Sequence, residues 1–125
     1  MKAAFALGAL SVALAGAAPA FAHHSFAMFE REKTVTLKGT VKQFQWINPH
    51  SWIVVTVQGD DGKTDDWAIE GGSPLALSKN GWSRDTFTPG DHITIVAKPL
   101  KNGDHGGSFV SAILKDGRPL GEHGP

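Results

Sequence analysis

The fold is decided by residues 34–58, which read TVTLKGTVKQFQWINPHSWIVVTVQ. In the first half of this stretch, apolar side chains alternate with polar ones, as in a strand with one buried face. The alternation then changes parity, from odd positions to even ones: Val35, Leu37 and Val41, then Phe44 and Trp46. This change near Lys42-Gln43 predicts a β-bulge, because a bulge inserts one extra residue into a strand. Gly39 suits a sharp bend in the same strand.

Turn and cap signals divide the rest of the chain into short elements. Gly59-Asp60-Asp61-Gly62-Lys63 has the residue types of a hairpin turn. Ser73 is a suitable helix N-cap, Pro74 a suitable first helical residue, and Gly81 a suitable residue just beyond the helix. We predict strands over 34–47, 51–58, 64–70, 92–98 and 109–115, and one helix over 74–80.

This order predicts an all-β fold, a small five-stranded OB-like barrel with one short helix between strands three and four. A long, bent first strand and a helix in that place are typical of the OB fold. An immunoglobulin-like sandwich needs about seven strands and no such helix. The bend lets the first strand belong to both sides of the barrel, so that no long sheet edge stays exposed.

The N-terminus has the features of an export signal. Lys2 is followed by an apolar stretch over 3–18 and by Ala20-Phe21-Ala22, a cleavage site of the A-x-A type. The stretch is shorter than the roughly 20 residues that span a bilayer. We therefore expect a periplasmic or secreted protein that is cut after Ala22, with no membrane insertion after signal cleavage. A cut after Ala20 is the alternative.

Cleavage after Ala22 divides the chain into four segments. We predict a signal peptide over 1–22, an N-terminal arm over 23–33, the OB-like barrel over 34–116 and a C-terminal tail over 117–125. The mature chain is long enough for one domain with a modest core.

The composition argues against several functions. The chain has no cysteine, which excludes disulfides, cysteine-based zinc sites, iron–sulfur clusters and thiol catalysis. Its 12 Lys and Arg balance 12 Asp and Glu, so we predict no nucleic-acid partner, since phosphate binding relies on an excess of basic residues. The adjacent carboxylates Asp60/Asp61 and Asp65/Asp66 are interpreted as solvated loop charges. With no G-x-S-x-G elbow or phosphate loop, we predict that the protein is not an enzyme and has no catalytic residues.

Three histidines are candidate metal ligands. Cleavage after Ala22 makes His23 the N-terminal residue, and its free amine and imidazole then form a nitrogen chelate that suits Cu(II). His24, in second position, permits an amine–amide–imidazole chelate. His50, in the loop Asn48-Pro49-His50-Ser51 between the first two strands, is the best candidate for a third ligand. We predict a copper site formed by His23, His24 and His50.

The other histidines are interpreted from their surroundings in the sequence. His105 lies in a glycine-rich loop between strands four and five. The first and fourth connections flank the ligand-binding face of OB barrels, so we predict that His50 and His105 lie at the same rim of the barrel. His92 is interpreted as an exposed turn residue, and His123 as part of the tail.

Several motifs are spread over essentially the whole mature chain. They are Ala22-His23-His24-Ser25-Phe26-Ala27-Met28-Phe29, Thr34-Val35-Thr36-Leu37-Lys38-Gly39-Thr40-Val41, Trp46-Ile47-Asn48-Pro49-His50-Ser51-Trp52, Trp67-Ala68-Ile69-Glu70, Gly81-Trp82 and Pro89-Gly90-Asp91. Together they resemble a family of exported bacterial proteins, domain of unknown function number 6152. The resemblance implies a small periplasmic β-barrel and supplies no activity.

A looser similarity, by fold and setting only, is to small periplasmic copper chaperones with OB barrels. This similarity implies a Cu(I) site of one His, two Met and one Trp within strands. The present sequence lacks the methionine pair, so that ligand set is not carried over.

The favoured interpretation is a non-enzymatic periplasmic small β-barrel protein that binds copper through the mature N-terminal histidines. The alternative is a generic periplasmic adaptor module that binds a small ligand or an envelope protein without metal, through loops 47–51 and 99–108. A third interpretation is an accessory subunit of an envelope redox enzyme.

Overall fold

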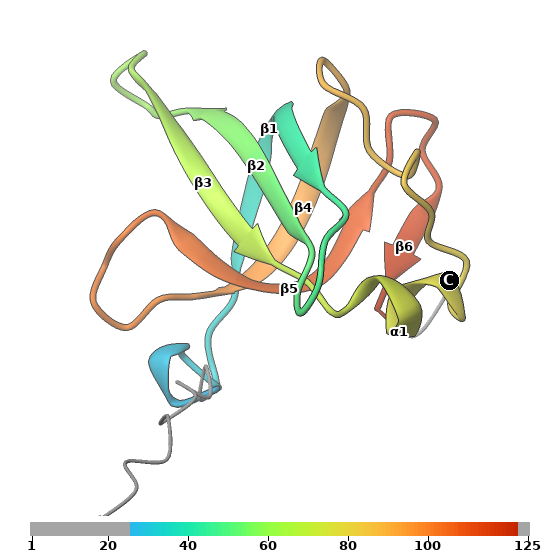
Figure 1. Cartoon of the computed structure of the whole chain (residues 1–125). Coiled ribbons are helices and arrows are strands. Elements are labelled where there is room, and N and C mark those ends of the chain that lie inside the picture. Colours follow the sequence, from blue (N-terminus) through green and yellow to red (C-terminus); the bar gives the residue numbers. More distant parts are fainter. Residues whose placement is uncertain (1–25, 123–125) are drawn as a thin grey trace, which may run out of the picture.

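The computed structural model describes residues 26–122, which form one closed sheet with a short helix beside it (Figure 1). The strands are β1 (Val35–Gln45), β2 (Trp52–Gln58), β3 (Thr64–Glu70), β4 (His92–Pro99), β5 (Gly106–Ile113) and β6 (Pro119–Gly121). The 3-10 helix η1 (Phe26–Met28) precedes them, and α1 (Pro74–Ser78) lies between β3 and β4.

The strand order is β3-β2-β1-β4-β5-β6, and β5 also pairs with β3, which closes the barrel. The prediction of an all-β, five-stranded OB-like barrel with one short helix between strands three and four is confirmed. The short strand β6 is added to it at the edge of β5.

The long first strand belongs to both sides of the barrel. Its N-terminal half pairs antiparallel with β4, and its C-terminal part pairs antiparallel with β2. The register with β2 shifts between Val41 and Gln43, so the predicted bulge is confirmed. After this bulge the even-numbered Phe44 packs against the core, whereas before it the odd-numbered Val41 does so.

Gly39 lies where β1 passes close to β2. A Cβ atom at this position would stand 2.4 Å from the carbonyl oxygen of Thr56 and 2.6 Å from Cγ1 of Val55. Both distances are far shorter than van der Waals contact, so only a residue without a side chain fits. The glycine that the sequence marks as a bend is required by the packing of β1 on β2.

The helix α1 begins at the predicted residue and ends at Ser78, two residues before the predicted end, with Lys79 as its C-cap. The Ser73 hydroxyl accepts a hydrogen bond from the Ala76 N–H at 3.2 Å, and a proline follows it at the first helical position. Beyond the helix Gly81 has φ +86°, and the Trp82 N–H donates to the Leu77 carbonyl at 3.2 Å. This C-terminal bond is the one expected of a glycine-terminated helix.

The fifth strand begins at Gly106, three residues before the predicted start, because two glycines of the loop join the ladder. A Cβ on Gly106 would lie 2.8 Å from Cδ1 of Leu100, and one on Gly107 would lie 2.7 Å from the Lys98 carbonyl oxygen. These glycines therefore allow β5 to approach its neighbours and to pair with β3. Glycine is more typical of loops than of strands, so the start of this strand was predicted too late in the sequence.

Segments on both sides of the predicted barrel pack onto it. Phe29, in the predicted arm, forms a β-bridge with Leu100 and is buried. Leu120, in the predicted tail, lies in β6 opposite Ala112 and is buried as well. The packed unit therefore includes parts of both flanking segments.

An aromatic cluster fills the core beside α1. The Trp82 ring makes edge contacts with Phe87 and Phe109, with centroids 5.6 and 4.9 Å away. Its Nε1–H donates to the Gly121 carbonyl at 2.8 Å. These contacts tie the segment after α1, strand β5 and strand β6 to one another.

Asp91 stabilises the turn before β4. One carboxylate oxygen accepts from the Thr88 N–H at 2.9 Å and the other from the Lys115 Nζ at 3.0 Å. Burial raises the pKa of Asp91, but these two bonds outweigh it, and the pKa lies below its ordinary value.

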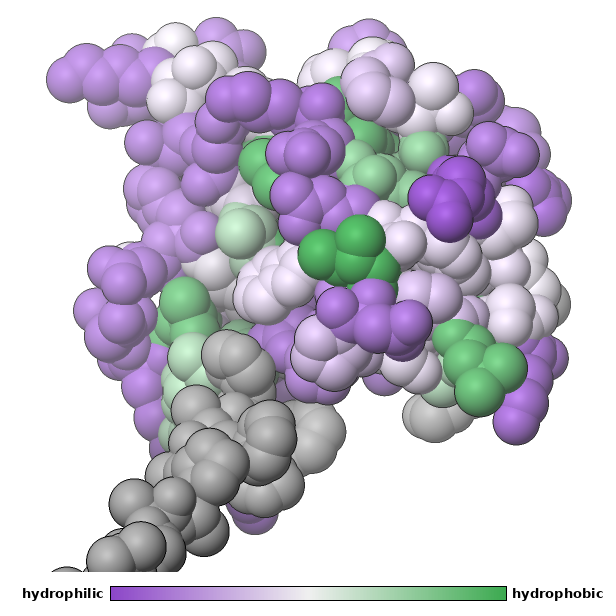
Figure 2. Space-filling view, viewed as in Figure 1, coloured by the Kyte–Doolittle hydropathy of each residue, from purple (hydrophilic) through white to green (hydrophobic). Residues whose placement is uncertain are grey.

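The surface seen in Figure 2 is mostly hydrophilic, with separate hydrophobic spots rather than one continuous patch. Within residues 26–122, no helix has the length and hydropathy needed to cross a membrane.

Candidate functional site

Of the predicted metal ligands, His23 and His24 lie outside the described residues, as does the predicted signal peptide. His50 lies between β1 and β2, and its Nδ1 pairs with Oε1 of Glu70. The Glu70 side chain is 8 % exposed and that of His50 is 37 % exposed. The pair therefore joins a buried carboxylate to an imidazole that reaches the surface.

Backbone hydrogen bonds hold this pair in place. Trp52, the first residue of β2, lies opposite Glu70, the last residue of β3. The Ser51 N–H donates to the Gly72 carbonyl at 2.9 Å, and the Gly71 N–H donates to the Ser51 carbonyl at 2.8 Å. The end of the β1–β2 loop is thus fastened to the segment that leaves β3, which brings the imidazole to the carboxylate.

The hydroxyl of Ser51 is buried and has no hydrogen-bond partner among the described residues. Its neighbour His50 therefore does not bond to this hydroxyl, although an imidazole between a carboxylate and a serine is a catalytic arrangement in hydrolases.

The imidazole of His105 has different partners. It stacks on the Trp67 indole, with centroids 4.9 Å apart and planes inclined by 22°. Its Nδ1 lies 3.7 Å from Oδ1 of Asp65, and its carbonyl accepts from the Ala68 N–H at 3.2 Å. These contacts hold the β4–β5 loop against residues 65–68 of β3.

The prediction that His50 and His105 lie at one rim is wrong. Their partners Glu70 and Asp65 lie about 16 Å apart along β3, and strand alternation directs these side chains to opposite faces. The reason is topological. Strands β1 and β4 are antiparallel neighbours, so the loops that follow them leave the sheet at opposite ends.

The third described imidazole is that of His92, whose Nδ1 lies 3.1 Å from the Thr40 hydroxyl. His50, His92 and His105 thus have three separate surroundings. Between residues 26 and 122, no three His, Asp or Glu side chains are grouped so that they could hold a metal ion.

A polar groove, which was not predicted from the sequence, crosses the outer face of β1. We call it the β1 groove; its volume is 570 Å³. Its polar lining comes mainly from outward-facing residues of β1, β2 and β4: Lys38, Thr40, Thr56, Gln58, His92 and Thr94. The signal in the sequence is the run of polar residues at even positions, but only the strand register shows that they meet on one surface.

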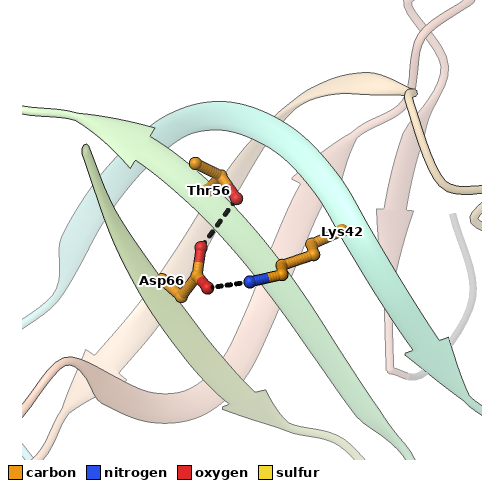
Figure 3. Close-up of polar contacts among 3 residues, drawn as sticks. All are labelled: Lys42, Thr56 and Asp66. Atoms are coloured by element: carbon orange, nitrogen blue, oxygen red, sulfur yellow. Dashed lines mark hydrogen bonds and ion pairs between the residues drawn. The ribbon is translucent and has the colours of Figure 1, made fainter.

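One wall of this groove continues into an ion pair, shown in Figure 3. The Lys42 Nζ lies 2.5 Å from one oxygen of Asp66, and the Thr56 hydroxyl donates to the other oxygen at 2.7 Å. The Lys42 hydrogen bond, followed by that from Thr56, holds the pKa of Asp66 below its ordinary value. Asp66 is therefore not the solvated loop charge that the sequence suggested, because it lies within β3 opposite Thr56.

A comparison with solved structures gives a similar barrel. The mitochondrial single-stranded DNA-binding protein Rim1 from S. cerevisiae (crystal form 2) matches with a TM-score of 0.50 and 12 % sequence identity. The match covers 66 % of this chain and 92 % of that chain. At this identity the similarity shows the fold alone. No curated protein matches the sequence.

This similarity overturns our prediction of no nucleic-acid partner, which is wrong. A barrel of this fold belongs to a protein that binds single-stranded DNA, so an even balance of charges over the whole chain is no ground for excluding such a ligand. Base stacking also contributes to single-strand binding and does not depend on net charge.

The motifs quoted above extend through the described barrel, from Phe29 beside the β4–β5 loop to the Pro89-Gly90-Asp91 turn before β4. A family model matches residues 11–109, which include β1 to β4 and the helix. The chain therefore belongs to the family of unknown function DUF6152.

Proposed function

We propose that the mature chain is a non-enzymatic periplasmic protein that binds copper through His23, His24 and His50. The observation that carries this proposal is the contact between the His50 imidazole and the buried Glu70 carboxylate. In metal sites a ligating histidine commonly donates its other ring N–H to a carboxylate, which fixes the ring and makes it a better ligand. With its proton on Nδ1, the His50 imidazole carries its lone pair on Nε2.

The path of the N-terminal arm supports the proposal. Phe29 bridges Leu100, and Leu100 lies beside Gly106 of β5, which pairs with Ala68 of β3. Three steps between neighbouring strands, each about 4.8 Å, place Phe29 about 14 Å from β3. Residues 26–28 form η1, which rises about 2 Å per residue, and residues 23–25 cover at most about 10 Å when extended. His23 therefore has a reach of about 16 Å from Phe29, enough to meet β3.

Copper suits this donor set better than other divalent metals. The three imidazoles and the α-amine freed by signal cleavage are all nitrogen donors. In the divalent series, Cu(II) binds to such sites most strongly. The ligands must lose their protons to bind, so affinity is expected to fall steeply as the pH falls through the ordinary imidazole value of about 6.5.

The test uses protein purified from the periplasm, with its N-terminus identified by mass spectrometry. Copper titration and EPR are applied to the parent protein and to H23A, H24A and H50A, with H105A as the matched control because its imidazole contacts Asp65 and Trp67 rather than Glu70. We expect one tightly bound Cu(II) with nitrogen coordination, weaker binding in the three ligand variants and parent-like binding in H105A. Parent-like binding in all four variants would show that the site is elsewhere. A mature N-terminus at Phe21 would remove the proposed chelate.

The alternative, a module that binds a small ligand or an envelope protein without metal, has one specific observation in its favour. The β1 groove is a formed surface hollow that lies apart from His50. The groove contains no residue of loops 47–51 and 99–108, through which this binding was predicted from the sequence, so the groove and the copper site can be tested separately.

A further inference from the structure

The β1 groove is built where the strong bend of β1 brings the outer faces of several strands together. The register places Lys38 beside Thr94 and Thr40 beside both His92 and Thr56. Its volume of 570 Å³ lies within the range of roughly 300–1,000 Å³ that is typical of small-molecule sites. The groove is therefore large enough for a ligand of several rings or residues.

The lining offers hydrogen bonds to hydroxyl groups. Thr40, Thr56 and Thr94 each present a hydroxyl, which both donates and accepts, and Gln58 adds an amide. Thr40 and Thr56 are oriented by the contacts with His92 and Asp66. Within the described part of the chain, the Thr94 hydroxyl makes no side-chain hydrogen bond, so it is available to a ligand.

The charge of the groove fits one acidic group rather than many. Lys38 forms no ion pair with any described residue, whereas Lys42 is neutralised by Asp66 (Figure 3). A nucleic-acid backbone presents a phosphate at every nucleotide, and its binding needs several cations. One uncompensated ammonium, that of Lys38, among neutral hydroxyl groups favours a ligand with a single acidic group and many hydroxyls.

The groove also has an apolar side. Ile113 of β5 is 44 % exposed and lines it, and each threonine adds a methyl group. Sugar rings combine hydroxyl edges with apolar C–H faces, and this mixed lining complements both. We propose that the β1 groove binds a short oligosaccharide that carries a carboxylate, with the threonine hydroxyls contacting the sugar hydroxyls and Lys38 contacting the carboxylate.

The test is an NMR titration of the ¹⁵N-labelled mature protein with a trisaccharide that carries a single uronic-acid residue. The neutral trisaccharide maltotriose and a short oligothymidylate are titrated in parallel. We expect saturable shifts at the amides of Thr40, Thr56 and Thr94, with the acidic sugar binding more tightly than the neutral one. No shifts with the acidic sugar up to about 10 mM would overturn the proposal. Tighter binding of the oligothymidylate at the same amides would replace it with a nucleic-acid site.

Matched variants test the roles of the side chains. K38Q is expected to weaken binding of the acidic trisaccharide by about three- to tenfold, because it removes a charge-assisted hydrogen bond. T94V keeps the shape and removes one hydroxyl, so it should weaken both trisaccharides by about threefold. K101Q and T34V make the same changes at exposed positions outside the groove and should bind like the parent. Parent-like binding in K38Q and T94V would refute the assignment, and the amide spectra of all four variants report whether they are folded.

Discussion

The pair of His50 and Glu70 permits a quantitative test of the tertiary structure. His50 is replaced by alanine, Glu70 by glutamine, and both together, and the free energy of unfolding is measured for each. Removal of one partner from a fully buried ion pair costs about 3–5 kcal/mol. Here the carboxylate is 8 % exposed but the imidazole is 37 % exposed, so water screens the pair and a coupling energy of about 1–3 kcal/mol is expected.

The asymmetry of the pair gives a second, independent expectation. H50A leaves the buried carboxylate of Glu70 without this partner, whereas E70Q keeps an oxygen that accepts from the Nδ1–H of His50. H50A should therefore be the more destabilising single change, although its side chain is the more exposed. At about 4–8 °C per kcal/mol for a domain of this size, the Tm of H50A should fall by at least about 4 °C.

The assay is urea unfolding followed by the fluorescence of the four tryptophans. H92A combined with E70Q is the control, since the His92 imidazole contacts Thr40 on another part of the barrel. Independent changes add within about 0.5 kcal/mol, and the control should do so. Because E70Q removes the charge but keeps an accepting oxygen, a coupling between positions 50 and 70 below that limit would refute a charge-assisted contact between the two side chains.

Three further perturbations follow from the structure. G39A places a methyl group 2.4 Å from the Thr56 oxygen and should destabilise the barrel by about 3 kcal/mol or more, measured by urea unfolding; a loss below about 1 kcal/mol would contradict the close approach. The pKa of Asp91 is lower in the folded than in the unfolded protein, so the stability that Asp91 contributes is complete above the ordinary value of 3.8 and is lost as the pH falls through the folded value. D91N should therefore reduce the loss of folding stability on acidification, measured by urea unfolding at several pH values. An unchanged dependence of stability on pH would argue against this role. H105A uncovers one face of the Trp67 indole and should shift the tryptophan emission to longer wavelength, with little loss of stability; an unshifted spectrum would mean that the stack is not populated in solution.

Local signals in the sequence determined most of the barrel. The change of parity at Lys42-Gln43 predicts the bulge of β1, and the residue types of 59–63 predict the hairpin that joins β2 to β3. Ser73 and Gly81 predict the two ends of α1. Each of these features depends on residues close together in the chain, and their backbone preferences are strong enough to be recognised without knowledge of the neighbours.

The tertiary structure decided where distant residues meet. Gly106 reads as a loop residue, and joins β5 because the closing strands need its missing side chain. Leu120 lies in a segment with no strand signal and pairs only because β5 offers an edge.

The partners of the candidate site residues were decided in the same way. Glu70 meets His50 because β2 and β3 pair with that register, and His105 is separated from both because antiparallel strands send their following loops to opposite ends. The polar residues of the β1 groove come from strands far apart in the sequence, and a change of one residue in register would turn them toward the core. A sequence states which side chains alternate along a strand, but only the paired sheet determines which of them share a surface.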